Sequence, residues 1–349
     1  MSITIAVDAM GGDHGLAVTL PASMEALKRY SDLHIHLVGQ APLIEEALKS
    51  YQYDADRLKV VHAEQVIEME DKPSVALRNK RQSSMRIALN LVKEEQAQAC
   101  VSAGNTGALM AVSKFVLKTL PGIDRPAICT TMPTMKGQVY MLDLGANIGS
   151  DGENLAQFAV MGEVLAKALD GNPEPRVGLL NIGEEEIKGH QRIKDANAIL
   201  KRTQINYVGY AEGDDIFKGN FDVIACDGFD GNVALKASEG VAKMIAFYLK
   251  KAFNRNLLTK MIGLIAYPVL KSFKEEVDPR KYNGASLLGL RKIVIKSHGG
   301  TDVYGFRCAI EEARMEVIKD VPSLIASEVE RILTPEVTVL DASDSEQKA

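Results

Sequence analysis

Short apolar runs that end in glycine-rich turns recur along this chain and constrain its fold more than any other sequence feature. Most are followed within a few residues by glycine and then by a segment of helical period. The predicted strands are Ile3 to Val7, Leu33 to Val38, Leu58 to His62, Ala99 to Ser102, Gln138 to Leu142, Arg176 to Asn181, Asn206 to Gly209 and Val223 to Cys226. This alternation predicts an α/β protein with a largely parallel sheet and flanking helices. Ligands of open α/β sheets bind beyond the carboxyl ends of the strands, so we expect the active site among these turns.

The length of the chain, 349 residues, fits either two ordinary domains or one large α/β domain. We predict a single large catalytic domain over residues 1–340, which could consist of two lobes, and a frayed polar tail over residues 341–349. Long helices are expected from Ser74 to Glu94 and from Asn154 to Leu169, the second with a cap near Asp151.

The segment from Val241 to Lys274 departs from this pattern, because it contains six lysines, one arginine and no acidic residue. Phenylalanine and leucine alternate with the basic residues, which predicts an insertion of basic amphipathic helices, with Pro268 kinking or ending one of them. Two compatible interpretations remain open. The first is a helical hairpin that packs on a partner subunit. The second is a surface that lies on anionic lipid or binds an acidic carrier protein.

Composition and terminal pattern exclude several classes of protein. A formal net charge of -5 argues against a general nucleic-acid binder, because such proteins need a basic footprint. The four cysteines lie far apart and form no C-x-x-C pair, so we predict neither a disulfide framework nor a metal site. The first residues lack the pattern of a secretory signal and no apolar run is long enough to span a bilayer, which predicts a cytoplasmic protein.

The first glycine-rich turn follows the first predicted strand. Gly11 and Gly12 allow backbone N–H groups to approach a ligand closely, and the carboxylates of Asp8 and Asp13 bracket them. A tight turn with Asp8 as a helix cap would explain the same residues. This turn therefore indicates a binding site only in combination with other motifs.

Two further turns repeat this arrangement. Asn105 and Thr106 stand between two glycines at the start of a predicted helix, whose positive end can hold a phosphate without a lysine. Asp143 and Asn147 enclose a similar turn after another strand. Neither turn is a P-loop, and the lack of G-x-G-x-x-G argues against a nicotinamide cofactor, so we predict no cofactor. An ordinary capped turn is the alternative for the Asn105 motif.

Three residues in the second half of the chain are candidates for contact with the reacting group. Lys188 follows a strand and precedes a glycine, with a solvated surface lysine as the alternative. Asn232 could cap a helix or donate a hydrogen bond to a developing oxyanion. His298 precedes Gly299 and Gly300, which indicates a pocket wall, where packing or substrate contact is favoured over catalysis.

A family resemblance rests on several ordered blocks taken together. These are Val7 to His14, Ser83 to Arg86, Val101 to Met110, Gly122 to Ala127, Leu142 to Asn147, Leu180 to Glu186, Asp227 to Phe229 and Gly231 to Val233. From Ile3 to about Ile325, the chain resembles the bacterial PlsX family of phosphate acyltransferases. The resemblance implies transfer of a fatty acyl group from acyl carrier protein to inorganic phosphate. The acyl phosphate product would enter phosphatidic acid and phospholipid synthesis.

The resemblance also implies a homodimer whose fold is like those of the isocitrate and isopropylmalate dehydrogenases and the phosphotransacetylases. It implies peripheral contact with an anionic membrane at its inner face, and a glycerol-3-phosphate acyltransferase downstream. Two blocks depart from the family pattern, and the first is Ile148 to Ser150, which differs from the common continuation after Gly-Ala-Asn. In the second block, Asp230 stands where the Gly-Phe-x-Gly-Asn motif usually has threonine, so we expect an added negative charge near the anion site.

The implied chemistry fits these residue types. A thioester is already activated and phosphate is an adequate nucleophile, so no Ser-His or Cys-His pair is required. The site has to hold two reactants together and stabilise an oxyanion. We hypothesise that the glycine-rich turns hold phosphate with Asn105, Thr106 and Asn147, while Lys188 and Asn232 polarise the thioester carbonyl.

Three other functions compete with this hypothesis. A phosphotransacylase that uses short-chain acyl-CoA would share the phosphate site and differ in the thioester carrier. A decarboxylating dehydrogenase would need an aspartate cluster for a metal and a nicotinamide site, and the sequence shows neither motif. A membrane-bound scaffold without catalysis would explain the basic helices but not the anion-type turns.

Overall fold

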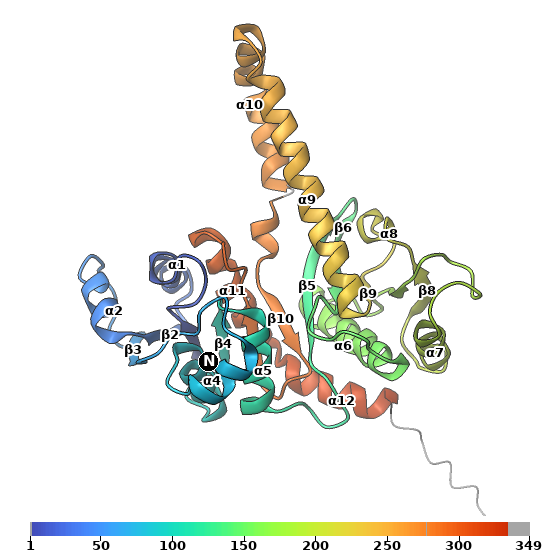
Figure 1. Cartoon of the computed structure of the whole chain (residues 1–349), viewed down its shortest axis with the longest axis horizontal. Coiled ribbons are helices and arrows are strands. Elements are labelled where there is room, and N and C mark those ends of the chain that lie inside the picture. Colours follow the sequence, from blue (N-terminus) through green and yellow to red (C-terminus); the bar gives the residue numbers. More distant parts are fainter. Residues whose placement is uncertain (1, 277, 334–349) are drawn as a thin grey trace, which may run out of the picture.

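A single mixed sheet runs through the computed structural model, which describes residues 2–276 and 278–333 (Figure 1). In spatial order its strands are β3 (Leu58–His62), β2 (Leu33–Gly39), β1 (Ile3–Asp8), β4 (Ala99–Ser102), β11 (Ile293–Lys296), β10 (Ala285–Leu288), β5 (Ala127–Thr134), β6 (Gly137–Leu142), β9 (Val223–Ala225), β7 (Val177–Leu180) and β8 (Tyr207–Ala211). Every predicted strand is present. Strands β5, β10 and β11 were not predicted, and two of these form the antiparallel centre of the sheet.

The antiparallel centre of the sheet separates two groups of parallel strands and aligns the carboxyl ends of β11 and β6. Strands β3, β2, β1, β4 and β11 run in one direction, and β6, β9, β7 and β8 run in the other. In the register between them, Ile295 lies opposite Ser286, Ser286 opposite Cys129, and Cys129 opposite Leu142. The carboxyl end of β6 is therefore level with that of β11, three strands or roughly 14 Å away.

Helices cover both faces of the sheet. They are α1 (Leu16–Arg29), α2 (Ala41–Leu48), α3 (Pro73–Asn79), α4 (Ser84–Lys93), α5 (Thr106–Leu117), α6 (Gly152–Asp170), α7 (Gln191–Leu200), α8 (Asp215–Lys218), α9 (Gly228–Phe253), α10 (Leu257–Glu276), η1 (Pro279–Tyr282), α11 (Val303–Lys319) and α12 (Val321–Leu333). Strand side chains alternate between the faces, so Ala6 packs in the core with α4 and α5, while Ile5 and Val7 pack with α1 and α11. Helices α6, α7 and α12 cover the other end of that second face.

The predicted helix from Ser74 to Glu94 is wrong in one respect, because it consists of two helices, α3 and α4. The break has a tertiary cause. The ammonium of Lys80 donates to the carbonyl of Val66 at 2.7 Å and pairs with Asp71 at 2.5 Å. Ser83 then caps α4, accepting from the backbone N–H of Arg86 at 3.3 Å. The predicted helix from Asn154 corresponds to α6, whose cap is Asp151 as expected, with Asn154 N donating to it at 2.8 Å.

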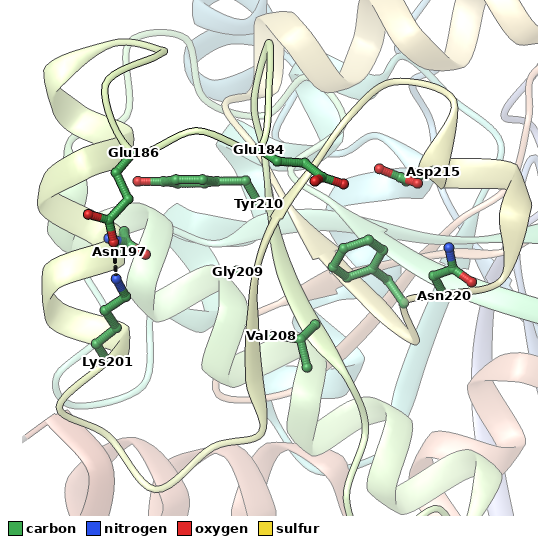
Figure 2. Close-up of a pocket in the computed structure, with 10 residues that line it drawn as sticks. Glu184, Glu186, Asn197, Lys201, Val208, Gly209, Tyr210, Asp215 and Asn220 are labelled. Atoms are coloured by element: carbon green, nitrogen blue, oxygen red, sulfur yellow. Dashed lines mark hydrogen bonds and ion pairs between the residues drawn. The ribbon is translucent and has the colours of Figure 1, made fainter.

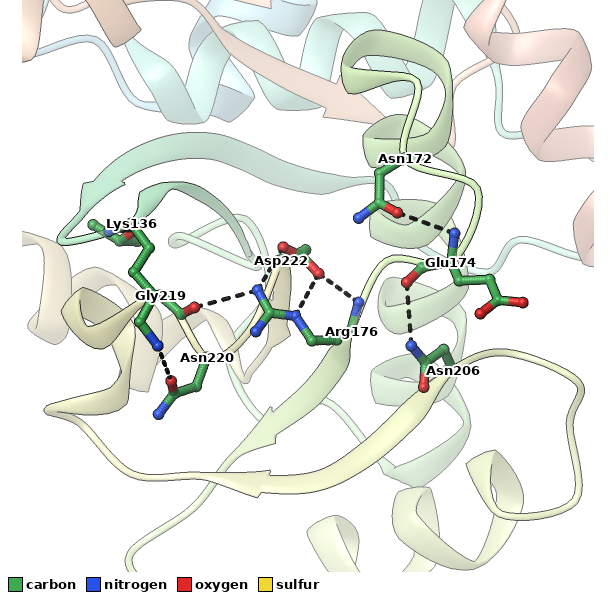
Figure 3. A network of polar contacts seen from close by, with 9 residues as sticks. Lys136, Asn172, Glu174, Arg176, Asn206, Gly219, Asn220 and Asp222 are labelled. Carbon is green, nitrogen blue, oxygen red and sulfur yellow. Dashed lines mark hydrogen bonds and ion pairs between the residues drawn. The ribbon is translucent and has the colours of Figure 1, made fainter.

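A network of polar contacts fixes the far end of the sheet (Figure 3). The guanidinium of Arg176, just before β7, donates to both carboxylate oxygens of Asp222, just before β9, with two bonds of 2.9 Å. Lys136 in the β5–β6 turn donates to Asn220 at 2.9 Å. The fork between Arg176 and Asp222 ties the starts of β7 and β9 together, which helps to set their parallel register.

Helices α9 and α10 form a hairpin that projects from the body of the molecule (Figure 1). The predicted basic amphipathic segment is helical, and it begins earlier than expected, at Gly228. Pro268 does not end a helix, because α10 continues through it to Glu276. The hairpin exposes large apolar side chains, with Leu257 77%, Leu264 75% and Ile265 80% exposed. No helix in the described residues is long and apolar enough to cross a membrane. The predicted tail, 341–349, lies outside the described residues.

Candidate active site

The turn after β1 and the turn after β4 interlock. Asp8 is buried and accepts a hydrogen bond of 2.6 Å from the hydroxyl of Ser102, and burial raises the pKa of its carboxyl. A Cβ at Gly11 would lie 2.6 Å from the Asp8 carboxylate and 2.8 Å from Gly104 N, so only glycine fits there. Gly12 has a φ of +88° and lies against Ala103. Asp8, Gly11 and Gly12 thus shape this turn, and direct contact with substrate stays a prediction for them.

The loop after β11 joins these two turns. The backbone N–H of Asp13 donates to the carbonyl of Gly299 at 2.9 Å, and the Asp13 carboxylate lies beside Gly299 and Gly300. His298 is held by its own backbone N–H, which donates to Asn283 at 2.9 Å, and by its Nδ1, which accepts from Gly300 N at 3.1 Å. The ring therefore carries its proton on Nε2 when neutral, and burial lowers its pKa. The structure thus brings Asp8, at the end of β1, and Asp13, in the turn after it, close to the loop after β11 that carries His298.

Asn105 and Thr106 lie at the N-terminus of α5, next to the same turns. The side chain of Asn105 caps α5 by accepting from Ala108 N at 2.9 Å, and its amide donates to the carbonyls of Met69 and Asp71. Thr106 is exposed. The Asn105 side chain would have to give up one of these bonds to reach a ligand, whereas the positive end of the helix is set beside the turns without such a change.

Asp143 and Asn147 stabilise the turn after β6 through their hydrogen bonds. The Asp143 carboxylate is fully buried and accepts from the backbone N–H groups of Ile128 at 2.9 Å and Asn147 at 2.6 Å. The amide of Asn147 donates to Pro126 O at 2.8 Å and to Asp143 at 3.0 Å. Both amide hydrogens are therefore occupied, so a direct phosphate contact by Asn147 would cost one of these bonds. That contact remains a prediction.

Helix α9 starts on this turn and then projects from the body of the molecule (Figure 1). Gly228 N donates to Asn147 O at 2.9 Å, and Asn232 packs on Gly145. Lys236 lies one turn beyond Asn232 on the same face of the helix. The charges of Lys236, Glu239 and Lys243 on α9 influence the pKa of His298 in the loop after β11, although burial is the main cause of its lowering. Asn232 thus packs on the turn after β6, and its contact with the reacting group stays a prediction.

Lys188 lies in the segment between β7 and α7. Its ammonium pairs with Glu185 at 2.8 Å, which raises its pKa, and its side chain is 45% exposed. Nearby, a cavity of about 480 Å³ lies on the outer side of edge strand β8 (Figure 2). Its lining includes the carboxylates of Glu184, Glu186 and Asp215, so it does not suit an inorganic anion. No hydrogen bond or ion pair joins Lys188 to Asn232 among the described residues, and its catalytic role stays a prediction.

Asp230 does not add an unpaired charge to the site. Its carboxylate pairs with the guanidinium of Arg192 on α7 at 3.2 Å, and the same guanidinium lies 3.5 Å from Asp227. Asp227 in turn caps α9 by accepting from Phe229 N at 3.0 Å. Asp230 is thus paired with Arg192, which it shares with Asp227, and these contacts hold α7 against the start of α9.

Sequence reasoning missed three residues that the structure places at this site. Lys296 is the last residue of β11, Lys236 faces the loop after β11 from α9, and Asn283 holds that loop by donating to Ser297 Oγ at 2.8 Å. A lysine that ends an apolar run directly before Ser-His-Gly-Gly was a usable signal for Lys296. Asn283 precedes β10, which the sequence did not predict, so nothing local indicated its role.

These features define an α/β enzyme of the phosphotransacetylase fold class. The structure is similar to a phosphotransacetylase from Streptococcus pyogenes, with a TM-score of 0.61 and 15% identity, covering 91% of this chain and 94% of that one. It is also similar to the EutD phosphotransacetylase from Staphylococcus aureus, with a TM-score of 0.57 and 14% identity, covering 93% and 94%. At such identity the likeness shows the fold alone, and it confirms the predicted fold class.

Sequence comparison then gives the family. Residues 3–324 match the family described as fatty acid synthesis protein. The chain is 75% identical over 334 residues to the phosphate acyltransferase of Hydrogenovibrio crunogenus, which covers 95% of this chain and 99% of that protein. The chain therefore belongs to the PlsX family of phosphate acyltransferases, and the predicted enzyme class is confirmed.

Proposed function

We propose that this phosphate acyltransferase takes a fatty acyl group from acyl carrier protein, transfers it to inorganic phosphate, and supplies the acyl phosphate to phosphatidic acid synthesis. The observation that supports this most is the course of α9. One helix carries Asn232 at its start, a lysine face beside the anion-type turns in its middle, and an exposed apolar and basic hairpin at its far end.

The proposed reaction needs no cofactor to balance. One oxygen of hydrogen phosphate forms a bond to the thioester carbonyl carbon, which creates a tetrahedral oxyanion. The C–S bond then breaks, and the proton of hydrogen phosphate ends on the sulfur of the released thiol. Positioning and oxyanion stabilisation therefore dominate the catalysis.

Each predicted residue has a part in this proposal. Asn232 donates to the thioester carbonyl and its oxyanion, and Lys188 joins it after leaving Glu185. The N-terminus of α5, with Thr106, faces the phosphate. Asp8, Gly11, Gly12, Asp13, Asn105, Asp143 and Asn147 hold the turns in place, and His298 contacts substrate.

The hairpin of α9 and α10 supports the proposals about partners. Its exposed apolar side chains need a partner surface, because patches of this kind on soluble proteins mark interaction sites. We assign it to a homodimer contact near the body, with the basic face available to an acidic carrier protein or to the inner face of an anionic membrane. The enzyme would then act in the cytoplasm at the membrane surface and pass its product to a glycerol-3-phosphate acyltransferase.

The test is incubation with palmitoyl-acyl carrier protein, with and without phosphate, followed by trapping of the product with hydroxylamine. We expect phosphate-dependent hydroxamate. A parallel reaction with acetyl-CoA separates the proposed donor from the short-chain alternative, because a phosphotransacylase of acyl-CoA would prefer acetyl-CoA. If neither donor yields hydroxamate, the proposed reaction is wrong.

A further inference from the structure

Lys296 is a buried lysine at the point where the glycine-rich turns meet. It ends β11, and only 9% of its surface is exposed. Its ammonium donates to the carbonyl of Ala103 at 3.4 Å and to the carbonyl of Ser297. An ammonium has three N–H donors, so one is left over after these two bonds.

The charge of Lys296 is not neutralised by a direct partner. Among the described residues no carboxylate forms an ion pair with it, although Asp8 and Asp13 act on it from a greater distance. Asp8 is itself buried and accepts the hydrogen bond of Ser102, so its carboxylate is engaged with another partner. A buried cation without a paired anion is unfavourable, so this position favours the binding of a negative group.

A second lysine faces the same place from α9. The charge of Lys236 acts on both Lys296 and His298, and its side chain is 56% exposed and 3.2 Å from Glu239. Lys296 contacts Ala103, which stands two residues before the Asn105 cap of α5, so the positive end of that helix adjoins the same position. Lys296 therefore adjoins the start of α5, and Lys236, one helical turn from Asn232, is near enough for its charge to act on Lys296.

We propose that inorganic phosphate binds between Lys296 and Lys236, beside the N-terminus of α5. The two ammonium groups hold phosphate oxygens from opposite sides, and Asn232 holds the thioester carbonyl within one turn of α9. This assignment deepens the proposed function and rests on it. The lysines that bind phosphate then lie on β11 and α9. Neither of them belongs to a P-loop.

The kinetic test measures the KM for phosphate at pH 7 in the palmitoyl-acyl carrier protein reaction. Lys296→Gln and Lys236→Gln should each raise it about ten- to a hundredfold, as expected for loss of a charge-assisted hydrogen bond, with little change in the KM for the acyl donor. Lys292→Gln is the matched control. Lys292 directly precedes β11, has 37% of its side chain exposed, and pairs with Glu95 at 2.8 Å, and this change should leave both constants unaltered.

A pH series gives a readout that a purely structural lysine would not move. Burial lowers the pKa of Lys296 to about 8 against the opposing effect of Asp8 and Asp13, and with a further lowering by Lys236. The ammonium is charged below this pH, so the KM for phosphate in the wild type should rise as the pH passes 8. Lys296→Gln should lack that rise. If Lys296→Gln lowers the melting temperature but leaves the KM for phosphate unchanged, Lys296 only stabilises the turn at Ala103. That result would overturn the proposal.

Thermal unfolding with added inorganic phosphate, at constant ionic strength, separates this proposal from the reaction itself. Phosphate should raise the melting temperature of the wild type and of Lys292→Gln, and not of Lys236→Gln, whose exposed position tolerates the change. This result would support the phosphate site even if no donor yielded hydroxamate. In that case only the proposed reaction would be wrong. An equal phosphate response in the wild type and Lys236→Gln would refute the two-lysine site, also where Lys296→Gln fails to fold.

Discussion

Replacing Gly231 by alanine should disable the enzyme through a displacement that the structure allows us to estimate. Gly231 lies in the first turn of α9, where an added Cβ would be 2.1 Å from the carbonyl oxygen of Asp143 and 2.7 Å from the sulfur of Cys226. Ordinary contact begins at 3.4 Å, so the helix or the turn below it has to move by about 1.3 Å. The nearest obstacle is backbone, which cannot rotate away as a side chain can.

Two effects follow from this displacement. Overpacking of this kind costs about 1–3 kcal/mol of folding free energy. Asn232 is the next residue and packs on Gly145, so it moves with the helix, and a misplacement of about 1 Å costs on the order of a hundredfold in rate. We therefore expect a clear loss of kcat beyond the loss of stability.

The assay combines hydroxamate formation with urea denaturation. Gly240→Ala is the matched control, because Gly240 lies in the same helix and a Cβ there meets nothing within 4 Å. Alanine at that position should stabilise the protein by about 0.5–1 kcal/mol and leave kcat unchanged. Wild-type kcat and an unaltered urea midpoint in Gly231→Ala would refute the reasoning about the start of α9.

Three further predictions concern other parts of the molecule. Lys188→Ala and Asn232→Ala should each slow acyl-phosphate formation about a hundredfold with folding intact, and near-normal turnover would remove that residue from the mechanism. Asn105→Ala should lower stability by about 1 kcal/mol in thermal unfolding through loss of the α5 cap, whereas Asn105→Ser, which keeps a capping oxygen, should cost less; equal losses would contradict the capping role. Burial, with a contribution from Asp170, raises the pKa of Glu312 to about 7 from its ordinary 4.5, so the folded state binds the proton more tightly than the unfolded state. Stability measured by urea denaturation should therefore fall as the pH rises from about 5 to 7, and less steeply in Glu312→Gln; an identical slope would show that another group is responsible.

Much of the fold could be read from local patterns. Strands β1, β2 and β4 were predicted because their apolar runs are short and bounded by turns, and the cap of α6 at Asp151 is a local hydrogen bond. The failures have long-range causes. The helix from Ser74 to Glu94 is broken by contacts of Lys80 with a distant part of the chain, and these leave no trace in helical periodicity.

The candidate site shows the same division. The sequence indicated the turns at Gly11, Asn105 and Asp143, because glycine and short polar residues after a strand favour tight turns and helix caps. It could not show that the amide of Asn147 is occupied by Pro126 and Asp143, or that Asp230 is paired with Arg192. Those partners are distant in sequence, and only packing decides which polar group meets which.

By itself the sequence determined that this protein is an α/β enzyme with glycine-rich turns at strand ends and a basic amphipathic hairpin. Tertiary structure decided how the turns combine. The register of the antiparallel strands sets Leu142 level with Ile295, which brings the turns after β6 and β11 to the same level of the sheet. Tertiary structure also decided the burial of Lys296. The exposure and pKa of a lysine depend on what surrounds it after folding, which the residue type alone does not show.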